Sequence, residues 1–331
     1  MECAPILISV YHRLYTLRRC VEALKNNAEA KHSELYIVSD AAGRKEDEDR
    51  VAAVRAYMRT ITGFKAIHLI ERETNYGASK SIGLAFNEVM ARHGSIIFME
   101  DDILPSNFYL RYLNDGLRQY KNDKRVYAIC GYRHNFSLPK SYVKDVFVLN
   151  RFCPWGYAIW RDRIDRRYNG CESGFRDVRM AYDRYSEFQD SMPQLFNWML
   201  RHDPRTLNIL KADSDGRICA GDVRLEYYLF RTGLVCVYPR CTMTNMMPSG
   251  LDAMHCTYKW SADEPLANCA MRFSEIPMKQ DEVVYRRFLT SRYPCLLSRA
   301  LFSLRKNGLR KTMGYYLRRL VGRDCKKDFV E

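Results

Sequence analysis

The chain has 331 residues, of which 47% are hydrophobic, which is enough for one large domain or for two halves that share a core. Its formal net charge of +14 predicts an anionic partner: a nucleic acid, a nucleotide-bearing ligand or an acidic membrane surface. The sequence has no apolar run long enough to cross a bilayer and no internal repeat, which excludes a membrane-spanning helix bundle and a solenoid.

The cysteine pattern indicates the compartment. Twelve cysteines are scattered from Cys3 to Cys325, and none have the Cys-x-x-Cys spacing of a zinc site. This is typical of reduced thiols in a cytosolic protein. The first predicted strand begins a few residues from the N-terminus, so we expect no signal peptide. The expected location is cytoplasmic, either free or peripheral on the cytoplasmic face of the inner membrane.

Strands and helices alternate through the first hundred residues. Short apolar runs rich in β-branched residues predict buried strands, and apolar residues at helical spacing predict the helices between them. Such alternation predicts a parallel sheet covered on both faces, with a ligand bound across the carboxyl ends of its strands. The predicted strands are 5–11, 35–39, 66–70 and 96–99, and the predicted helices are 16–26, 51–61 and 82–90.

Three consecutive acids, Glu100, Asp101 and Asp102, follow the strand predicted at 96–99. Pro105 is expected to break the strand, and Ser106 to cap a helix beginning near Asn107. Like charges this close repel unless a cation reaches them, and carboxylate oxygens suit Mn²⁺ or Mg²⁺. An acidic surface turn is the alternative, but the flanking strand and helix favour a site.

Two further charges follow predicted strands. Arg13 comes after the first strand and Asp40 after the second. A cation and a carboxylate at adjacent strand ends could hold a phosphate and a base or ribose, although each alone is more typical of a solvated loop. The chain lacks the Gly-x-Gly-x-x-Gly and Walker A patterns, which argues against a nicotinamide enzyme and a P-loop NTPase.

The second half of the chain carries an aromatic turn. Trp155 lies between Pro154 and Gly156, where glycine permits close backbone approach, and its face could stack on a sugar. Trp160 is expected to be core. The strands predicted in this half are 126–130, 146–149 and 235–238.

Asp222 precedes a helix predicted at 223–231. It is either the N-cap of that helix, which is the more frequent use of such an aspartate, or a catalytic acid, and the sequence leaves both open. The following segment, 242–255, is expected to be a loop, and a lone histidine at its end is usually solvated. From Tyr285 onward, basic residues and leucines alternate at helical spacing. This region either binds anionic lipid or packs on the body through its leucines.

In sequence the chain resembles nucleotide-sugar glycosyltransferases of the GT-A fold. It is similar to bacterial family-2-type enzymes and to N-acetylglucosaminyltransferase I of the Golgi, over roughly residues 5–255. Any one of the shared motifs is weak, but together in this order they are specific for the superfamily. The motifs are PILISVYHR, YIVSDAAG, NYGASKSIGLAF, IIFMEDDILPS, FCPWGYAIW, GDVRLEYYLFRTG and VYPRCTMTNMMPSGLDAMH.

The resemblance implies roles for individual residues. Asp102 would bind Mn²⁺ or Mg²⁺ beneath the donor diphosphate, with His255 as a further metal or phosphate ligand. Asp222 would be the catalytic base, although Gly221 stands where relatives carry an aromatic residue, which leaves acceptor recognition in doubt. The implied donor-binding residues are Arg13, Asp40, Asn75, Lys80, Glu100, Asp101, Trp155 and Gly156.

The resemblance therefore implies a metal-dependent, inverting glycosyltransferase of α/β GT-A architecture with a mainly parallel sheet. It would move a hexose or N-acetylhexosamine from a nucleotide-sugar, expected to be a UDP-sugar, to a hydroxyl of a glycan or lipid-linked saccharide. We expect residues 1–125 to bind the donor, 126–270 to form the acceptor half of the same domain, and 271–331 to form a basic helical region.

Two other function classes remain open. A sugar-phosphate nucleotidyltransferase shares the sheet and the metal, but it carries a glycine-rich loop after the first strand that HRLYTLRR lacks. A non-catalytic basic module that binds membrane or nucleic acid is consistent with the charge. No aromatic-basic RNA motif supports a nucleic-acid partner.

Overall fold

The protein is described here from a computed structural model, which covers residues 3–167, 209–210, 212–213, 217–218, 220–247, 265–279 and 281–292. The strands are β1 (Ile6–Val10), β2 (Glu34–Ser39), β3 (Ala66–Glu71), β4 (Ser95–Glu100), β5 (Ile103–Pro105), β6 (Val126–Cys130), β7 (Val146–Leu149), β8 (Tyr157–Trp160), β9 (Val235–Pro239) and β10 (Thr244–Met246). The α-helices are α1 (Leu14–Lys25), α2 (Glu48–Met58), α3 (Ala78–His93), α4 (Tyr109–Gln119), α5 (Arg161–Arg167), α9 (Gly221–Thr232) and α10 (Glu282–Arg292), and two 3-10 turns span Ala30–His32 and Lys45–Asp47.

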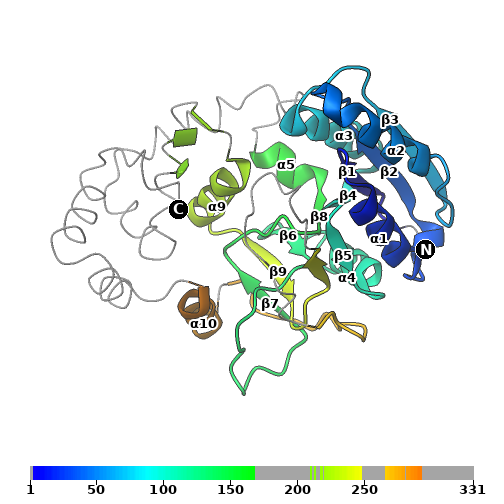
Figure 1. The fold of residues 1–331 in the computed structure, drawn as a ribbon. Coiled ribbons are helices and arrows are strands. Elements are labelled where there is room, and N and C mark those ends of the chain that lie inside the picture. The colour runs from blue at the N-terminus through cyan, green and yellow to red at the C-terminus, as the bar shows by residue number, and fades with distance from the viewer. Residues whose placement is uncertain are drawn as a thin grey trace, which may run out of the picture.

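One eight-stranded sheet runs through the described residues in the order β3-β2-β1-β4-β8-β6-β9-β7 (Figure 1). Strands β1 to β4 are mutually parallel, as the alternation of strands and helices predicts. Strand β9 is parallel to β6, whereas β7 and β8 run antiparallel to their neighbours. The sheet is therefore mainly parallel, and it continues from the N-terminal half into the second half without a break.

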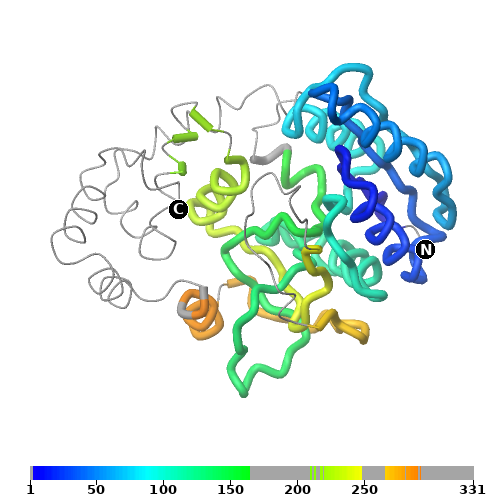
Figure 2. Tube along the Cα trace, in the orientation of Figure 1, coloured from blue at the N-terminus to red at the C-terminus, as the bar shows by residue number. Residues whose placement is uncertain are grey.

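Helices cover both faces of this sheet, and the side chains of each strand alternate between them. In β1, Ile6 and Ile8 face the core shared with α1, α2 and α4, whereas Leu7 faces the core shared with α3, α9 and α10. All three side chains have no solvent exposure. A strand buried on both faces has no polar side to alternate with, which is why these segments are continuously apolar in sequence. The tube in Figure 2 shows the first four strands and α1–α3 on one side of the molecule.

Strand β8 joins the two halves and was missed from the sequence. It inserts between β4 and β6 and pairs antiparallel with both, with Tyr157 opposite Phe98 and Cys130. The sequence predicts an aromatic turn followed by a core residue over 151–160. The turn is present, but Tyr157–Trp160 continues as a central strand. Trp160 is core as expected, at 5% exposure, and its indole nitrogen donates to the carbonyl of Leu117 at 3.2 Å.

A second small sheet corrects two further expectations. Residues Ile103–Pro105 form β5 and pair antiparallel with β10, which lies within the segment expected to be a loop at 242–255. Pro105 is therefore the last residue of a strand, and α4 begins at Tyr109, later than expected. Ser106 still caps the turn before α4, because its hydroxyl accepts a hydrogen bond from the Phe108 amide at 3.3 Å.

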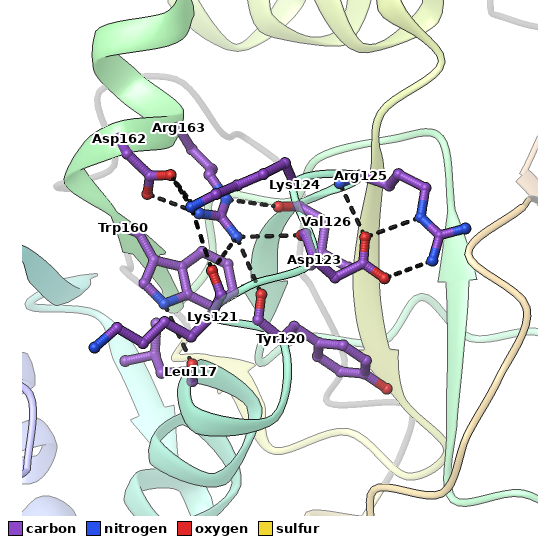
Figure 3. Close-up of polar contacts among 10 residues, drawn as sticks. All are labelled: Leu117, Tyr120, Lys121, Asp123, Lys124, Arg125, Val126, Trp160, Asp162 and Arg163. Atoms are coloured by element: carbon purple, nitrogen blue, oxygen red, sulfur yellow. Dashed lines mark hydrogen bonds and ion pairs between the residues drawn. The ribbon is translucent and has the colours of Figure 1, made fainter.

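The start of α5 is fixed by a buried arginine (Figure 3). The side chain of Arg163 is 3% exposed, and its guanidinium lies over the Trp160 ring, 4.3 Å from the ring centroid. It donates hydrogen bonds to four backbone carbonyls in the α4–β6 connection, those of Tyr120, Lys121, Asp123 and Val126. Arg163 thus holds the connection between α4 and β6 against the end of β8.

Helix α10 shows that the C-terminal region packs on the body at least as far as Phe288. Val284, Tyr285 and Phe288 are buried in the core that also contains α3 and α9. The region expected to be basic and helical therefore begins with a docked helix, and residues 293–331 lie outside the described residues. A search of the described helices finds none that is long and apolar enough to cross a membrane.

Candidate active site

The three acids lie at the carboxyl end of β4, beside the carboxyl end of β1. Parallel pairing places Ser9 opposite Glu100, and the amide of Asp101 donates to the Ser9 carbonyl at 3.1 Å. The carbonyl of Asp102 accepts from the amide of Met247, just beyond β10, at 2.7 Å. The acidic turn is thus held from two sides, and it lies where open α/β sheets bind their ligands.

Arg13 contacts two of these acids directly. Its guanidinium donates to both oxygens of Asp101, at 3.0 Å to Oδ2 and 2.5 Å to Oδ1, and to Oδ2 of Asp102 at 2.8 Å. The hydroxyl of Thr16 donates to Asp101 Oδ2 at 2.9 Å. Burial by itself would lower the pKa of Arg13, but the two carboxylates raise it above its ordinary value. The resemblance assigns Arg13 to the nucleotide, whereas its side chain here is occupied by the acids.

Thr16 could not have been identified from the sequence. It lies in the first turn of α1, where threonine has no distinguishing signal, and its role depends on Asp101, which follows a different strand. The hydroxyl of Thr16 completes the set of hydrogen-bond donors around the Asp101 carboxylate. Asp101 as a whole residue is 2% exposed. Burial raises the pKa of Asp101, and the guanidinium of Arg13 opposes that rise.

Asp102 has one oxygen paired and one oxygen without a partner. Oδ2 accepts from Arg13, whereas Oδ1 is buried and makes no hydrogen bond. A buried carboxylate oxygen without a partner is costly, and it fits a hard divalent cation such as Mn²⁺ or Mg²⁺. The part of the chain that the structure describes contains no group of three or more His, Cys, Asp or Glu side chains able to hold a metal. A cation here would therefore take further ligands from the substrate, as Mg²⁺ commonly does with phosphates. His255 lies outside the described residues.

Glu100 is held in an environment that resists ionisation. Its pKa is raised from 4.5 to about 7, mainly by burial and next by the charges of Asp102 and Asp101, while Arg13 opposes the rise. The charge of Asp222 also raises this pKa, so the start of α9 lies close enough to the acids to act on them electrostatically. Glu100 is therefore partly protonated near neutral pH and is able to donate a hydrogen bond, unlike an ordinary glutamate.

Asp40 organises the loops after β2 and β3. Its carboxylate, 6% exposed, accepts hydrogen bonds from the amides of Ala41 at 3.0 Å and Tyr76 at 3.0 and 3.2 Å. The side-chain amide of Asn75 donates to the Ala41 carbonyl at 2.7 Å. Lys80 lies over the Tyr76 ring, with its Nζ 4.5 Å from the ring centroid. Asp40, Asn75 and Lys80 thus belong to one pair of loops at the strand ends.

Trp155 and Gly156 lie at the same end of the β4–β8 ladder as the acids. Phe98 is opposite Tyr157 in the β4–β8 ladder, so the residues preceding Tyr157 run alongside those following Phe98. Gly156 has φ of +80°, and a Cβ there would come within 2.8 Å of the Tyr109 hydroxyl, so only glycine fits without displacement. The Trp155 ring packs edge-to-face on Tyr132, with ring centroids 4.6 Å apart. The aromatic pair and the carboxylates thus both lie beyond the Phe98–Tyr157 end of the ladder.

Asp222 lies within the first turn of α9, which begins one residue earlier at Gly221. The N-cap position belongs to Ala220, and Asp222 makes no cap hydrogen bond. Asp222 is exposed, and no hydrogen bond or ion pair involves its side chain within the described residues. Glu226, one turn further along, is instead paired with the buried Arg151 at 2.7 Å. Of these two acids, only Asp222 presents a carboxylate to solvent without an ionic partner.

Comparison with known proteins gives a family match. A sequence profile of the family described as Glycosyl transferase family 2 matches residues 6–184, just over half of the chain. The match begins at β1 and includes the acidic turn after β4. Comparison with curated proteins finds no match.

Solved structures give remoter likenesses. The mannosyltransferase PcManGT from Pyrobaculum calidifontis, in complex with GDP-Man and Mn²⁺, is 16% identical with a TM-score of 0.37, over 51% of this chain and 48% of that one. TarS from S. aureus is 13% identical with a TM-score of 0.34, over 50% of this chain and 29% of that one. TarS 1–349 in complex with UDP-GlcNAc is 11% identical with a TM-score of 0.34, over 51% and 48%. The chain thus spans about half or less of the length of these proteins.

Proposed function

Since the chain belongs to glycosyl transferase family 2, we propose that it transfers a sugar from a nucleotide-sugar to an acceptor hydroxyl. The proposed reaction depends on a divalent cation and inverts the configuration at the anomeric centre of the sugar. The donor is a UDP-sugar carrying a hexose or N-acetylhexosamine. The acceptor is a glycan or lipid-linked saccharide. The proposed donor, acceptor and stereochemistry are supported by the resemblance of the chain's motifs to those of GT-A enzymes, and the proposed metal dependence is supported in addition by the site.

The observation that carries the proposal is the buried, unpartnered Oδ1 of Asp102 beside the Arg13 guanidinium. Asp102 would hold Mn²⁺ or Mg²⁺, and the cation would neutralise charge on the leaving diphosphate. Arg13 would keep Asp102 oriented by occupying its other oxygen. Glu100, partly protonated, would face the donor sugar and donate a hydrogen bond to it. These roles give Asp102 and Glu100 distinct tasks at the end of β4.

Asp222 is the proposed base. It would accept the proton of the acceptor hydroxyl as that oxygen attacks the anomeric carbon, and the transition state would be oxocarbenium-like, as in other glycosyl chemistry. Two observations support this role: its carboxylate is exposed without a partner, and its charge acts on Glu100. Trp155, packed on Tyr132 at the same end of the β4–β8 ladder as the acids, would provide an apolar face against a sugar ring.

Removal of the metal-binding carboxylate tests this proposal. We expect Asp102→Asn to abolish Mn²⁺-dependent binding of UDP-sugars in calorimetry while the protein remains folded, because an amide cannot replace the carboxylate charge. Asp115→Asn is the matched control: Asp115 is an aspartate on α4 paired with Arg118 at the surface. Unchanged Mn²⁺-dependent binding in Asp102→Asn would reject the site, and equal losses in both variants would point to a general effect of charge.

A further inference from the structure

The start of α9 is capped from outside the helix. The residue at the N-cap position is Ala220, whose methyl side chain cannot accept a hydrogen bond. Its backbone amide instead donates to Oδ1 of Asp213 at 2.7 Å, across seven positions of the chain. Asp213 is 1% exposed, so a full carboxylate is buried at this helix end. Negative charge at a helix N-terminus is favourable because of the helix dipole and the free amides there.

The second oxygen of Asp213 forms an ion pair with the first turn of the same helix. Oδ2 lies 3.4 Å from Nε of Arg224, a residue of α9, without a hydrogen bond between the two atoms. The segment that carries Asp213 also packs on α9, because Leu210 forms a buried cluster with Ala220, Val223 and Tyr227. Asp213 therefore fixes α9 on both sides of Asp222: through the amide that precedes the helix and through a side chain two residues after Asp222.

The two aspartates have opposite environments. Asp213 is buried with both oxygens in contact with α9, whereas Asp222 is exposed and makes no hydrogen bond or ion pair with the described residues. An aspartate at a helix start ordinarily caps the helix itself. Here a residue from outside the helix does the capping, so the carboxylate in the first turn remains available to substrate.

We propose that Asp213 is a positioning residue for the reaction: it anchors the first turn of α9 so that the Asp222 carboxylate is held, uncapped, where the acceptor hydroxyl is deprotonated. This inference rests on the proposed role of Asp222 as base. Asp213 acts through the backbone of Ala220 and through Arg224, and it does not itself contact donor or acceptor. Small displacements of a catalytic group are costly, since about 1 Å of misplacement can reduce a rate by about a hundredfold.

The test compares three substitutions on the full chain. Asp213→Ala removes both contacts, and we expect kcat to fall by about ten- to a hundredfold with donor KM unchanged, because α9 does not hold the donor. Asp213→Asn keeps an acceptor oxygen for the Ala220 amide and should restore most of the rate. Asp281→Ala is the matched control: Asp281 caps α10 by accepting from the amides of Val283 and Val284 at 2.9 and 3.1 Å. It should lower the melting temperature without changing kcat.

The reaction measured is Mn²⁺-dependent hydrolysis of a nucleotide-sugar, with the donor chosen from UDP-N-acetylglucosamine, UDP-glucose and GDP-mannose. If Asp213→Ala does not fold, Asp213→Glu takes its place, since the longer side chain keeps the charge but displaces Ala220. Amide hydrogen exchange over 220–224 needs no substrate, and it should accelerate in Asp213→Ala and not in Asp281→Ala. Unchanged exchange there would overturn the inference by itself.

A double substitution separates this inference from the proposed function. If Asp213 acts through Asp222, then Asp213→Ala added to Asp222→Asn should slow hydrolysis no further than Asp222→Asn alone. Additive losses would overturn the positioning role and indicate a separate structural one. If Asp222→Asn alone leaves the rate unchanged, the base assignment fails, whatever Asp213→Ala does. If Asp222→Asn is slow and Asp213→Ala is as fast as wild type, the base assignment survives and the positioning role fails.

Discussion

Consecutive acids at the end of β4 have different environments because a single arginine lies among them. Arg13 pairs with Asp101 and with one oxygen of Asp102, and burial keeps Glu100 partly protonated. Without Arg13, three adjacent carboxylates would repel one another in a poorly hydrated turn. The distribution of charge at this edge of the sheet is therefore set by individual contacts, and it can be tested one residue at a time.

The pH dependence of stability should identify Glu100. In the metal-free folded protein its pKa is about 7 instead of 4.5, so between these values the folded state keeps a proton that the unfolded state has lost. Linkage then requires the contribution of Glu100 to the free energy of unfolding to fall as pH rises from about 4.5 to 7, and to level off above that.

Glu100→Gln should remove this part of the pH dependence. The measurement is urea unfolding of both proteins between pH 4.5 and 8, with Glu88→Gln as control because Glu88 is an exposed residue of α3 paired with Arg92. We expect the variant to gain stability relative to wild type as pH rises. A constant difference across this range would contradict the raised pKa of Glu100.

Asp222→Asn should separate catalysis from helix capping. Because Asp222 makes no cap hydrogen bond, the substitution should leave the melting temperature nearly unchanged. Loss of a general base typically costs about a hundred- to ten-thousandfold in rate. We therefore expect sugar transfer to collapse while metal-dependent donor binding persists. Transfer within a few-fold of wild type would reject Asp222 as base, and Glu226 would not replace it, since that carboxylate pairs with Arg151.

At the scale of elements, antiparallel β8 connects two sets of otherwise parallel strands. It places Trp155 and Gly156 at the same end of the β4–β8 ladder as the acids of β4, and its far end leads directly into α5. That far end is fixed by Arg163, whose guanidinium satisfies carbonyls of the α4–β6 connection and lies over Trp160 (Figure 3). A shift of β8 would move the aromatic turn, so this anchor supports the site from a distance.

Arg163→Met should destabilise the fold by roughly 2–4 kcal/mol, because it leaves several buried carbonyls without donors. The matched control is Arg125→Met in the same connection, since Arg125 is exposed and pairs only at the surface with Asp123. That change should leave the free energy of unfolding nearly unchanged, because an exposed ion pair contributes little to stability. Urea unfolding measures both, and equal effects would show that the carbonyl contacts of Arg163 contribute little.

At the scale of the whole molecule, the family match and the mainly parallel sheet confirm the GT-A fold class expected from the resemblance. The family match also favours a glycosyltransferase over the nucleotidyltransferase and the non-catalytic module that the sequence left open. The division at residue 125 stays a prediction. One sheet contains strands from both sides of residue 125, which is consistent with two halves of a single domain.

The net charge of +14 remains to be explained by a partner, and we predict that residues 293–331 bind anionic membrane. Truncation should follow Arg292, because α10 buries Phe288 against the core and its removal would expose that surface. We expect the shortened chain to lose flotation with vesicles containing phosphatidylserine while keeping donor hydrolysis. Equal flotation of both chains would assign the positive charge to another role.

The sequence by itself determined the elements whose signals are local. Apolar runs and helical spacing located β1 to β4 and their helices, and the acids after 96–99 marked the ligand edge, because strand direction alone places them there. The tertiary structure decided what depends on segments distant in the chain. Strand β8 has no periodicity of its own that distinguishes it from an aromatic turn, and β5 and β10 are too short to be recognised without each other. Likewise, the partners of Arg13 and the uncapped state of Asp222 arise from side chains that only the folded chain brings together. Long-range pairing has no local periodic signal, so these features could be seen only in the structure.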